Sequence, residues 1–277
     1  MRKPQRVALV GYGAVAQAVL RHLAPFQAKG GVDGKEVEVL AVLLRPGWQE
    51  KKRPEPPAPV RFLDDLGELL AVRPDLVIEC AAQGAVAQYA ERVVSAGADL
   101  MTISMGAFAD DDLFERVKAA TRQSGAQIIL PAGAVGGLDV LAAVRYDGIE
   151  SVLFRSTKPP RAWLGTAAEK LIDLERVVEP ACFFKGNARE AARSYPQNAN
   201  VAAAVALAGV GFERTTIELI ADPAAAGNRN EIVAEGPFGR FEINILGRTR
   251  PEAPRTSISA PLSIVRAVLS RSAGLVV

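Results

Sequence analysis

The stretch VALVGYGAVA, residues 7–16, decides the fold that we expect for this chain. Residues 7–10 form a short apolar run that stops at Gly11, and apolar residues then recur at helical spacing from 14 to 23. This pattern predicts a strand, a tight turn and a helix. The turn reads GYGAVA and fits GxGxx(G/A) between a strand and a helix, which is the context required of a dinucleotide-binding fingerprint.

Each small residue of this turn has a physical role in binding a dinucleotide. Gly11 permits the tight turn, Gly13 lets a pyrophosphate approach the backbone, and Ala16 keeps the helix close to the sheet. Amide groups at the start of the helix would then hold the phosphates. The alternative is a glycine turn that serves packing alone. The predicted cofactor contacts in the turn are Gly11, Tyr12, Gly13, Ala14 and Val15.

Strand and helix patterns alternate through the first half of the chain. The further apolar strands and the helical segments between them occupy residues 37–44, 75–82, 85–97, 99–105, 111–125 and 126–133. This alternation predicts a parallel sheet covered on both faces. We therefore expect a Rossmann dinucleotide-binding domain over residues 1–133. Ligands bind at the carboxyl ends of such strands, so Ala81 and Ala82 are also predicted cofactor contacts.

The pattern changes beyond residue 134. Shorter strand-like runs lie at residues 151–157, 176–186, 215–222, 230–236 and 239–248, the last two as a hairpin. They predict a second sheet that is largely antiparallel, with a helix at 198–210 on one face. The expected fold class is therefore α/β, with a Rossmann domain followed by a second α/β domain over 134–254. The amphipathic tail is expected to pack back on one of the two domains.

Composition and charge exclude several classes of partner. The chain has 277 residues, of which 49% are apolar, and 33 basic residues nearly balance 31 acidic ones. This balance favours a small-molecule ligand over nucleic acid or a membrane surface. The apolar run at 201–211 is too short to span a bilayer. Because the fold needs the N-terminal strand and turn, we do not interpret them as a cleaved leader, and the expected location is the cytoplasm.

The two cysteines, Cys80 and Cys182, lie far apart and have no CxxC or histidine pattern near them. We therefore expect neither a disulfide nor a metal site, and we interpret both residues as buried thiols. The stretch 48–60 is rich in proline and charge, so we expect it to be a surface loop.

The residue that follows the second predicted strand bears on the choice of cofactor. An acidic residue there would bind the ribose 2′-hydroxyl of NAD, but this strand ends with Leu44 and Arg45. The planar guanidinium of arginine matches a phosphate group, so Arg45 is predicted to meet the 2′-phosphate of NADP. The alternative is a solvated arginine at a strand end. We therefore expect NAD or NADP as the cofactor, with NADP accepted.

The order of motifs resembles that of the L-aspartate dehydrogenase family over nearly the whole chain. The stretches that carry the resemblance are VGYGAVA, ADLMTISMGAFADDDLFERV, GAVGGLD, KGNAREAARSYPQNANVAAAVALAG, IELIADP and the terminal GLVV. The resemblance implies a Rossmann domain completed by a C-terminal helix within 255–277, and a second domain that shapes the substrate site and the subunit contacts. It also implies a homodimer or a larger homo-oligomer.

The resemblance further implies oxidation of L-aspartate to iminoaspartate by hydride transfer from Cα to NAD(P). The imine would hydrolyse to oxaloacetate or feed pyridine nucleotide biosynthesis. Ala134 in GAVGG and Asn200 in NANVAA occupy positions of the family's cofactor contacts. Ala134 follows an apolar strand, and Asn200 can bind a nicotinamide carboxamide. From the sequence alone, Asn198 and Asn200 could equally cap a helix.

One position departs from the family pattern. Where the family has NxHEI, this chain has NRNEI, so Asn230 replaces a histidine that is taken to be the acid/base group. Asparagine does not titrate near neutral pH, and a positioned base is worth about 10²- to 10⁴-fold in rate. Three ways to compensate for the missing histidine stay open: a substrate deprotonated at high pH, water held by Asn230, or Lys158 as the base. His22 lies in the first predicted helix and is not expected to take part.

A dicarboxylate substrate requires cations near it. The cations available in the second domain are Lys158, Arg161, Lys185 and Arg229. The alternative for each of them is an ordinary solvated charge on the surface. Lys158 is preferred, so Asn230 and Lys158 are the candidate catalytic residues. Two alternatives to L-aspartate oxidation stay open. One is a dehydrogenase for another small amino or hydroxy acid, and the other is an inactive nucleotide-binding sensor.

Overall fold

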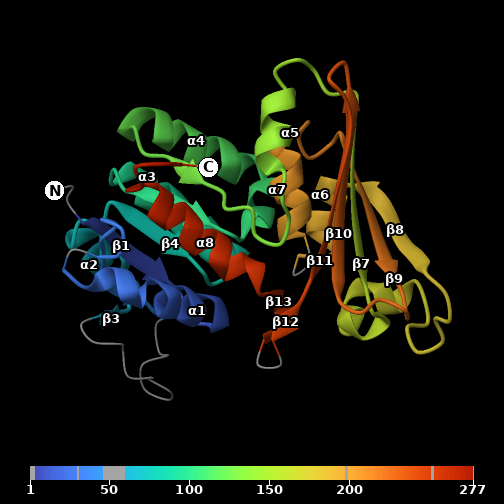
Figure 1. The fold of residues 1–277 in the computed structure, drawn as a ribbon, viewed down its shortest axis with the longest axis horizontal. Coiled ribbons are helices and arrows are strands. Elements are labelled where there is room, and N and C mark those ends of the chain that lie inside the picture. Colours follow the sequence, from blue (N-terminus) through green and yellow to red (C-terminus); the bar gives the residue numbers. More distant parts are fainter. Residues whose placement is uncertain (1–3, 30, 46–59, 197–198, 251–252, 277) are drawn as a thin grey trace. The chain divides into compact units, whose positions relative to one another are not determined.

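The computed structural model of the protein describes residues 4–29, 31–45, 60–196, 199–250 and 253–276. The chain forms two compact units (Figure 1). Unit 1 comprises Met1–Pro131 and Ala260–Val277, and unit 2 comprises Ala132–Ser259. The sequence-based boundaries at 133 and 254 lie a few residues from this division.

Unit 1 contains a six-stranded sheet in which every strand pair is parallel. Its strands are β1 (Gln5–Val10), β2 (Val37–Leu43), β3 (Arg61–Leu63), β4 (Leu76–Glu79), β5 (Asp99–Thr102) and β6 (Ile128–Ile129). The order β3-β2-β1-β4-β5-β6 is that of a doubly wound Rossmann sheet. The reversal of strand order beside β1 places a ligand crevice at the end of that strand.

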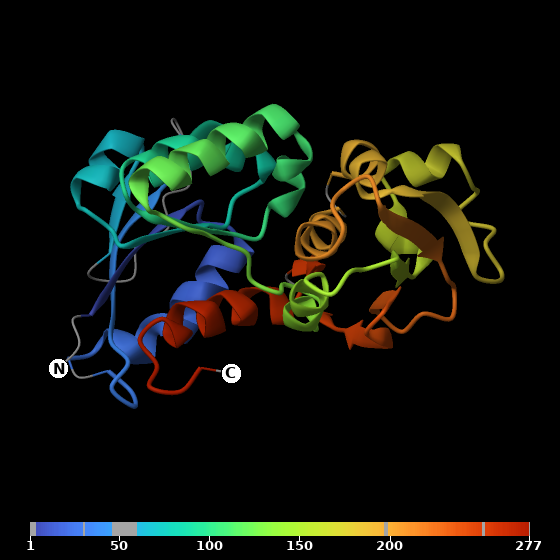
Figure 2. The ribbon, with the colours of Figure 1, turned by 90° about the horizontal axis from the view of Figure 1, so that it is seen from above.

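Helices cover both faces of this sheet, as expected (Figure 2). The helices of unit 1 are α1 (Ala14–Leu23), η1 (Ala24–Gln27), α2 (Leu66–Ala71), α3 (Gln83–Ser95), η2 (Met105–Ala109), α4 (Asp111–Ser124) and α8 (Ser259–Ser270). Helices α1 and α8 share one face, where Ile264 and Val268 of α8 join Leu9 and Val19 in the core. Helices α3 and α4 lie on the other face.

Several ends of elements differ from the sequence expectation. The run at 126–133 yields only the two-residue strand β6, because Pro131 has no amide hydrogen to donate and Gly133 adopts a positive φ of 66°. The run at 99–105 stops at Thr102 and continues into the 3₁₀ helix η2. The short elements β3 and α2 were not predicted.

Unit 2 contains a five-stranded sheet in the order β11-β10-β7-β9-β8. Its strands are β7 (Ser151–Lys158), β8 (Ala181–Asn187), β9 (Thr215–Ala221), β10 (Asn228–Gly236) and β11 (Gly239–Gly247). Three of the four strand pairs are antiparallel, and the β7–β9 pair is parallel. The predicted hairpin is present, since Gly236 pairs with Gly239.

The helices of unit 2 pack on one face of its sheet (Figure 2). The remaining elements are α5 (Leu138–Val144), η3 (Pro160–Trp163), η4 (Ala167–Lys170), α6 (Ala188–Ser194), α7 (Asn200–Ala208), β12 (Thr249–Arg250) and β13 (Ala253–Ser257). Along β7, the buried residues Val152, Phe154 and Ser156 occupy alternate positions, so these three share the helix-covered face. Helix α7 lies within the predicted 198–210.

The two thiols differ in exposure. Cys80 is buried, as expected, but the expectation for Cys182 is wrong because that residue is exposed. Cys182 belongs to the edge strand β8 and pairs in register with Ile220. The side chains of both residues lie on the face of the sheet opposite to the helices, which leaves the Cys182 side chain accessible.

Candidate functional site

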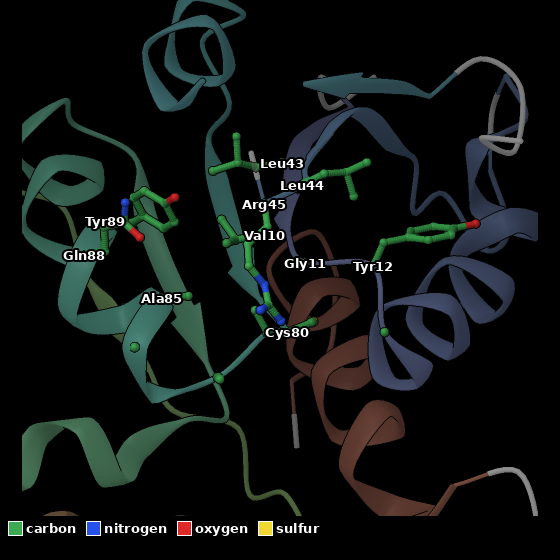
Figure 3. A pocket seen from close by; sticks show the side chains of 14 residues that line it. Val10, Gly11, Tyr12, Leu43, Leu44, Arg45, Cys80, Ala85, Gln88 and Tyr89 are labelled. Carbon is green, nitrogen blue, oxygen red and sulfur yellow. The ribbon is translucent and has the colours of Figure 1, made fainter. Parts of the chain in front are cut away.

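A cavity of about 510 Å³ lies at the carboxyl ends of β1, β2 and β4 in unit 1 (Figure 3). It is lined by Val10, Gly11, Tyr12, Gly13, Leu43, Leu44, Arg45, Cys80, Ala81, Ala82, Gly84, Ala85, Gln88 and Tyr89. This is the crevice that a doubly wound sheet offers to a nucleotide. Six of the predicted cofactor contacts line it: Gly11, Tyr12, Gly13, Arg45, Ala81 and Ala82.

The two glycines of the turn have different surroundings. Gly11 has a φ of 90°, and a Cβ atom added there would lie 2.7 Å from the Cβ of Ala81. Glycine is therefore required by both backbone conformation and space. Gly13 precedes α1, and no atom lies within 4 Å of a Cβ built on it. The backbone at Gly13 is thus open to a group as large as a phosphate.

The start of α1 supplies donors for an anion. The first helical hydrogen bond runs from the Gln17 amide to the Gly13 carbonyl over 3.0 Å. The amides of Ala14 and Val15 precede it and have no helical acceptor. The side chains of these two residues do not line the cavity, so their predicted contact rests on the backbone. The first turn of α1 has no acidic residue, and the positive end of the helix dipole favours a phosphate there.

Arg45 follows the end of β2 and is exposed at the cavity. Among the described residues that line the cavity, none is acidic, so no carboxylate there would repel a 2′-phosphate. The predicted loop at 48–60 lies outside the described residues except for its last member, Val60, which is buried. The residues present therefore fit a dinucleotide and are compatible with NADP.

The wall of the cavity that α3 forms includes two residues that were not predicted from the sequence. Gln88 and Tyr89 come from α3, and Figure 3 shows them on the side of the cavity away from Tyr12. With Ala85 they follow the i, i+3, i+4 spacing of one helix face, which was the available signal. The Tyr12 ring packs edge-on against Phe62, with 5.0 Å between ring centroids.

Two predicted residues, Asn230 and Ala134, meet within unit 2 together with Ser156, which was not predicted. We call the group formed by Ser156, Asn230 and the carbonyl of Ala134 the polar cluster. The Ser156 hydroxyl donates to Oδ1 of Asn230 over 3.1 Å, and Nδ2 of Asn230 donates to the Ala134 carbonyl over 3.1 Å. Asn230 is 5% exposed. Its amide therefore ties the 133–137 turn to the sheet and leaves one N–H and one lone pair for other partners.

Lys158 ends β7 and lies two residues beyond Ser156, so the alternation of the strand places both on the same face. Burial lowers the pKa of Lys158 to about 8. Its Nζ lies 4.6 Å from the centre of the Trp163 ring, a contact that favours the charged form and opposes this shift. Trp163 is fully buried, and its Nε1 donates to the Ile220 carbonyl. Lys158 thus titrates closer to neutral pH than an ordinary lysine.

The other candidate cations do not share this arrangement. Lys185 pairs with Glu218 on the opposite face of the sheet, where Arg155 also contacts Glu218 and Glu231. We call this surface the charged face. Arg229 also points to that face because it adjoins Asn230 on β10, and it is exposed.

The remaining predicted polar residues have other environments. Arg161 is exposed in η3. Asn200 is the first residue of α7, and Ala199 occupies the cap position, so a capping role for Asn200 is wrong. Asn198 lies outside the described residues. His22 lies in the last turn of α1 and is half-buried.

The described residues hold no candidate metal cluster and no candidate membrane-spanning helix. No group of three or more histidine, cysteine, aspartate or glutamate side chains in the described part of the chain could hold a metal ion. No helix formed by those residues is long and apolar enough to cross a membrane.

The Rossmann sheet, the glycine turn and the cavity define an NAD(P)-binding domain of the dehydrogenase class. Residues 11–131 match the model for the NAD-binding domain of homoserine dehydrogenase, and residues 139–271 match the model for the C-terminal domain of aspartate dehydrogenase. The chain belongs to the aspartate dehydrogenase family, and it is an NAD(P)-dependent oxidoreductase.

Relatives of known name match over the full chain. The chain is 41% identical to the L-aspartate dehydrogenase of Serratia proteamaculans over 95% of this chain and 96% of that protein. It is 39% identical to that of Brucella anthropi over the whole of both chains. The crystal structure of aspartate dehydrogenase from Thermotoga maritima has a TM-score of 0.77 at 24% identity, covering 99% of this chain and 100% of that one. That likeness shows the same fold.

Proposed function

We propose that this protein is an L-aspartate dehydrogenase that uses NAD or NADP and forms iminoaspartate, which hydrolyses to oxaloacetate. The observation that carries this proposal is identity of about 40% to L-aspartate dehydrogenases over the full chain. A bound nicotinamide would supply the acceptor for the hydride from Cα of the amino acid. The glycine turn and the start of α1 hold the phosphates, and Arg45 contacts the 2′-phosphate of NADP.

Lys158 acts as the acid/base group in this proposal. An amine with a pKa of about 8 is partly neutral under physiological conditions, so it can accept the proton that the amino group of the substrate releases. The position of Lys158 on the same face as Asn230 and Ser156 supports a shared site. In its charged form the same side chain can pair with a substrate carboxylate.

Asn230 orients groups rather than transferring protons. Its amide is held at both ends by Ser156 and Ala134, and its free N–H and lone pair can position a water molecule. Ala134 and Asn200 are proposed to contact the cofactor. The imine that forms is proposed to enter pyridine nucleotide biosynthesis when it escapes hydrolysis, and the protein is proposed to act in the cytoplasm.

The experiment that tests this function follows the absorbance of reduced nicotinamide with L-aspartate and either NAD or NADP, from neutral to alkaline pH. The wild type and the Asn230→His variant are compared, with Asn244→His in β11 as a control for the added imidazole. We expect turnover by the wild type that rises with pH, and a flatter profile for Asn230→His. A wild type that binds NADPH but leaves L-aspartate unoxidised at every pH would refute the proposal.

The presence of Asn230 where relatives of this family are expected to have histidine favours a second candidate, a dehydrogenase for another small amino or hydroxy acid. A screen of such acids with the same assay separates the two. An inactive nucleotide-binding sensor is separated by the fluorescence of bound NADPH. L-aspartate should alter that fluorescence if a substrate site is present.

A homodimer formed through the charged face is also part of this proposal. Leu153 and Val233 pair in register on the charged face and are only half-buried. The same face carries both positive and negative side chains, since Arg155 lies between Glu218 and Glu231. Such a surface is complementary to a second copy of itself. Light scattering should give a dimer for the wild type and a monomer for Leu153→Arg, whereas a monomeric wild type would contradict the assignment.

A further inference from the structure

Glu79, at the carboxyl end of β4, is a buried acidic residue to which the proposed chemistry gives no task. It is 2% exposed and immediately precedes Cys80, which lines the dinucleotide cavity. A buried carboxylate costs free energy unless it is fully hydrogen-bonded. Its partners therefore indicate what it stabilises.

Both carboxylate oxygens of Glu79 accept hydrogen bonds. Oε1 accepts from the Ala81 amide over 2.7 Å, and Oε2 accepts from the Thr102 hydroxyl over 2.6 Å. The Thr102 hydroxyl itself accepts from the Ser104 amide over 2.9 Å, which leaves its own hydrogen free to donate to Glu79. The network therefore joins the segments that follow β4 and β5.

The protonation state of Glu79 follows from these contacts. Burial raises the pKa of Glu79, while hydrogen bonds from Thr102, Ser104 and the amides of Ala81 and Ala82 act in the opposite direction. Since these contacts all come from donors, the carboxylate form of Glu79 accepts each of them without a proton of its own. Glu79 is thus a fixed acceptor behind the cavity wall.

Ala81 transmits this anchoring to the glycine turn. A Cβ atom built on Gly11 would lie 3.0 Å from Cα and 3.2 Å from the amide nitrogen of Ala81, so the two backbones are in close contact. The Cys80 amide also donates to the Val10 carbonyl over 2.9 Å. The position of Ala81 therefore sets the separation between the two loops that line the cavity.

We infer that Glu79 is a positioning residue for the dinucleotide. Through the Ala81 amide and Thr102, it holds the loop after β4 against Gly11 and fixes the shape of the cavity before the cofactor binds. This inference rests on the cofactor of the proposed function but not on its substrate. A preorganised site avoids the cost of ordering that loop on binding.

The test measures the dissociation constant of NADPH by fluorescence titration without any amino acid, for Glu79→Ala and Glu79→Gln. We expect about 10- to 100-fold weaker binding for Glu79→Ala, since two charge-assisted hydrogen bonds are lost. Glu79→Gln should stay within a few-fold of the wild type, because its carbonyl oxygen can still accept from Ala81. Glu115→Ala, which removes an exposed acid of α4, is the matched control and should bind normally.

Thermal unfolding of each variant separates positioning from loss of fold. If Glu79→Ala does not fold, Thr102→Val tests the inference instead. This variant removes the hydrogen bond from Thr102 to the carboxylate and should weaken NADPH binding several-fold. In a folded enzyme, the cofactor KM should rise while the L-aspartate KM stays constant. Unchanged NADPH affinity in folded Glu79→Ala or Thr102→Val, or equal damage from Ala and Gln, would overturn the inference. A wild type that binds NADPH but does not oxidise L-aspartate would refute only the proposed function.

Discussion

In unit 1 the glycine turn and the loop after β4 line the dinucleotide cavity with backbone and small residues, whereas the polar cluster of unit 2 includes side chains that meet across strands. Gly11, Gly13 and Ala81 act through the space that they leave and the amides that they expose. Ser156 and Asn230 act through the atoms at the ends of their side chains. Local sequence therefore specifies the first site closely, while the second depends on strand register.

Substitution of Lys158 should give the largest effect on the reaction rate. That effect would show that the chemistry depends on unit 2. In Lys158→Met, kcat should fall by about 10²- to 10⁴-fold, as for the loss of a positioned base. In the wild type, kcat should rise as pH increases through about 8, because the amine loses its proton there and becomes able to accept one. Both effects are measured by steady-state assays over a range of pH, and Lys118→Met serves as the control.

A different profile would change the role of Lys158. If the KM for L-aspartate rises above pH 8 while kcat does not, the charged form binds a carboxylate and is not the base.

Substitution of Gly11 should give the next largest effect, which is on NADPH affinity. It tests whether unit 1 binds the cofactor through its backbone. Gly11→Ala places a side chain at a φ of 90° and within 2.7 Å of Ala81. Strain and overpacking each cost about 1–3 kcal/mol, so NADPH affinity should fall about 100-fold by fluorescence titration.

Gly13→Ala sharpens this comparison. With a φ of −83° and no atom within 4 Å of the added Cβ, it should fold as stably as the wild type. It should lose affinity only if a ligand occupies the space beside it. If Gly13→Ala keeps both the stability and the NADPH affinity of the wild type, the turn serves packing alone.

Ser156 tests the coupling of side chains in unit 2. Ser156→Ala leaves the buried Oδ1 of Asn230 without its donor, which should lower the free energy of unfolding by about 1–3 kcal/mol. Thr157→Val is the matched control on the opposite face, because the buried Thr157 hydroxyl has no hydrogen-bond partner among the described residues. Chemical denaturation should show little loss for that variant. Similar losses for both would remove the case for the polar cluster.

Substitution of Arg45 should give the smallest effect. Among the described residues that line the cavity, Arg45 is the only charged one, and it bears on the choice of cofactor. Arg45→Ala should weaken NADP binding about 10-fold and leave NAD binding unchanged, since only NADP carries a 2′-phosphate. Competitive titration of both cofactors measures this difference, with Arg21→Ala in α1 as the control. Equal affinity of the wild type for the two cofactors, unchanged in Arg45→Ala, would make Arg45 a solvated surface residue.

Much of unit 1 could be predicted from the sequence because its signals are local. The glycine pattern follows an apolar strand directly, and the capping residue Asp110 precedes α4 and accepts from the Leu113 amide. Gln88 and Tyr89 were missed because a polar and an aromatic residue on a helix do not reveal which loop they face. The strand at 126–133 was overpredicted because the apolar pattern gives no weight to the missing donor of Pro131.

The polar cluster in unit 2 was harder to predict from the sequence. Resemblance to the family identified Asn230 and Ala134, but not their hydrogen bond across 96 residues of sequence. Ser156 was missed, since only the pairing of β7 with β10 brings it opposite Asn230. The same register separates Lys185 and Arg229 from Lys158, which residue type alone could not do.

Helix α8 has a consequence for the order in which the protein is made. Its residues Ile264 and Val268 fill the core beside Leu9, so one face of the Rossmann sheet stays exposed to water until α8 has left the ribosome. Unit 2 is continuous in sequence and can fold earlier. The nucleotide-binding unit therefore closes only after the whole of unit 2 has been made, and truncation before α8 should expose apolar surface to chaperones and proteases.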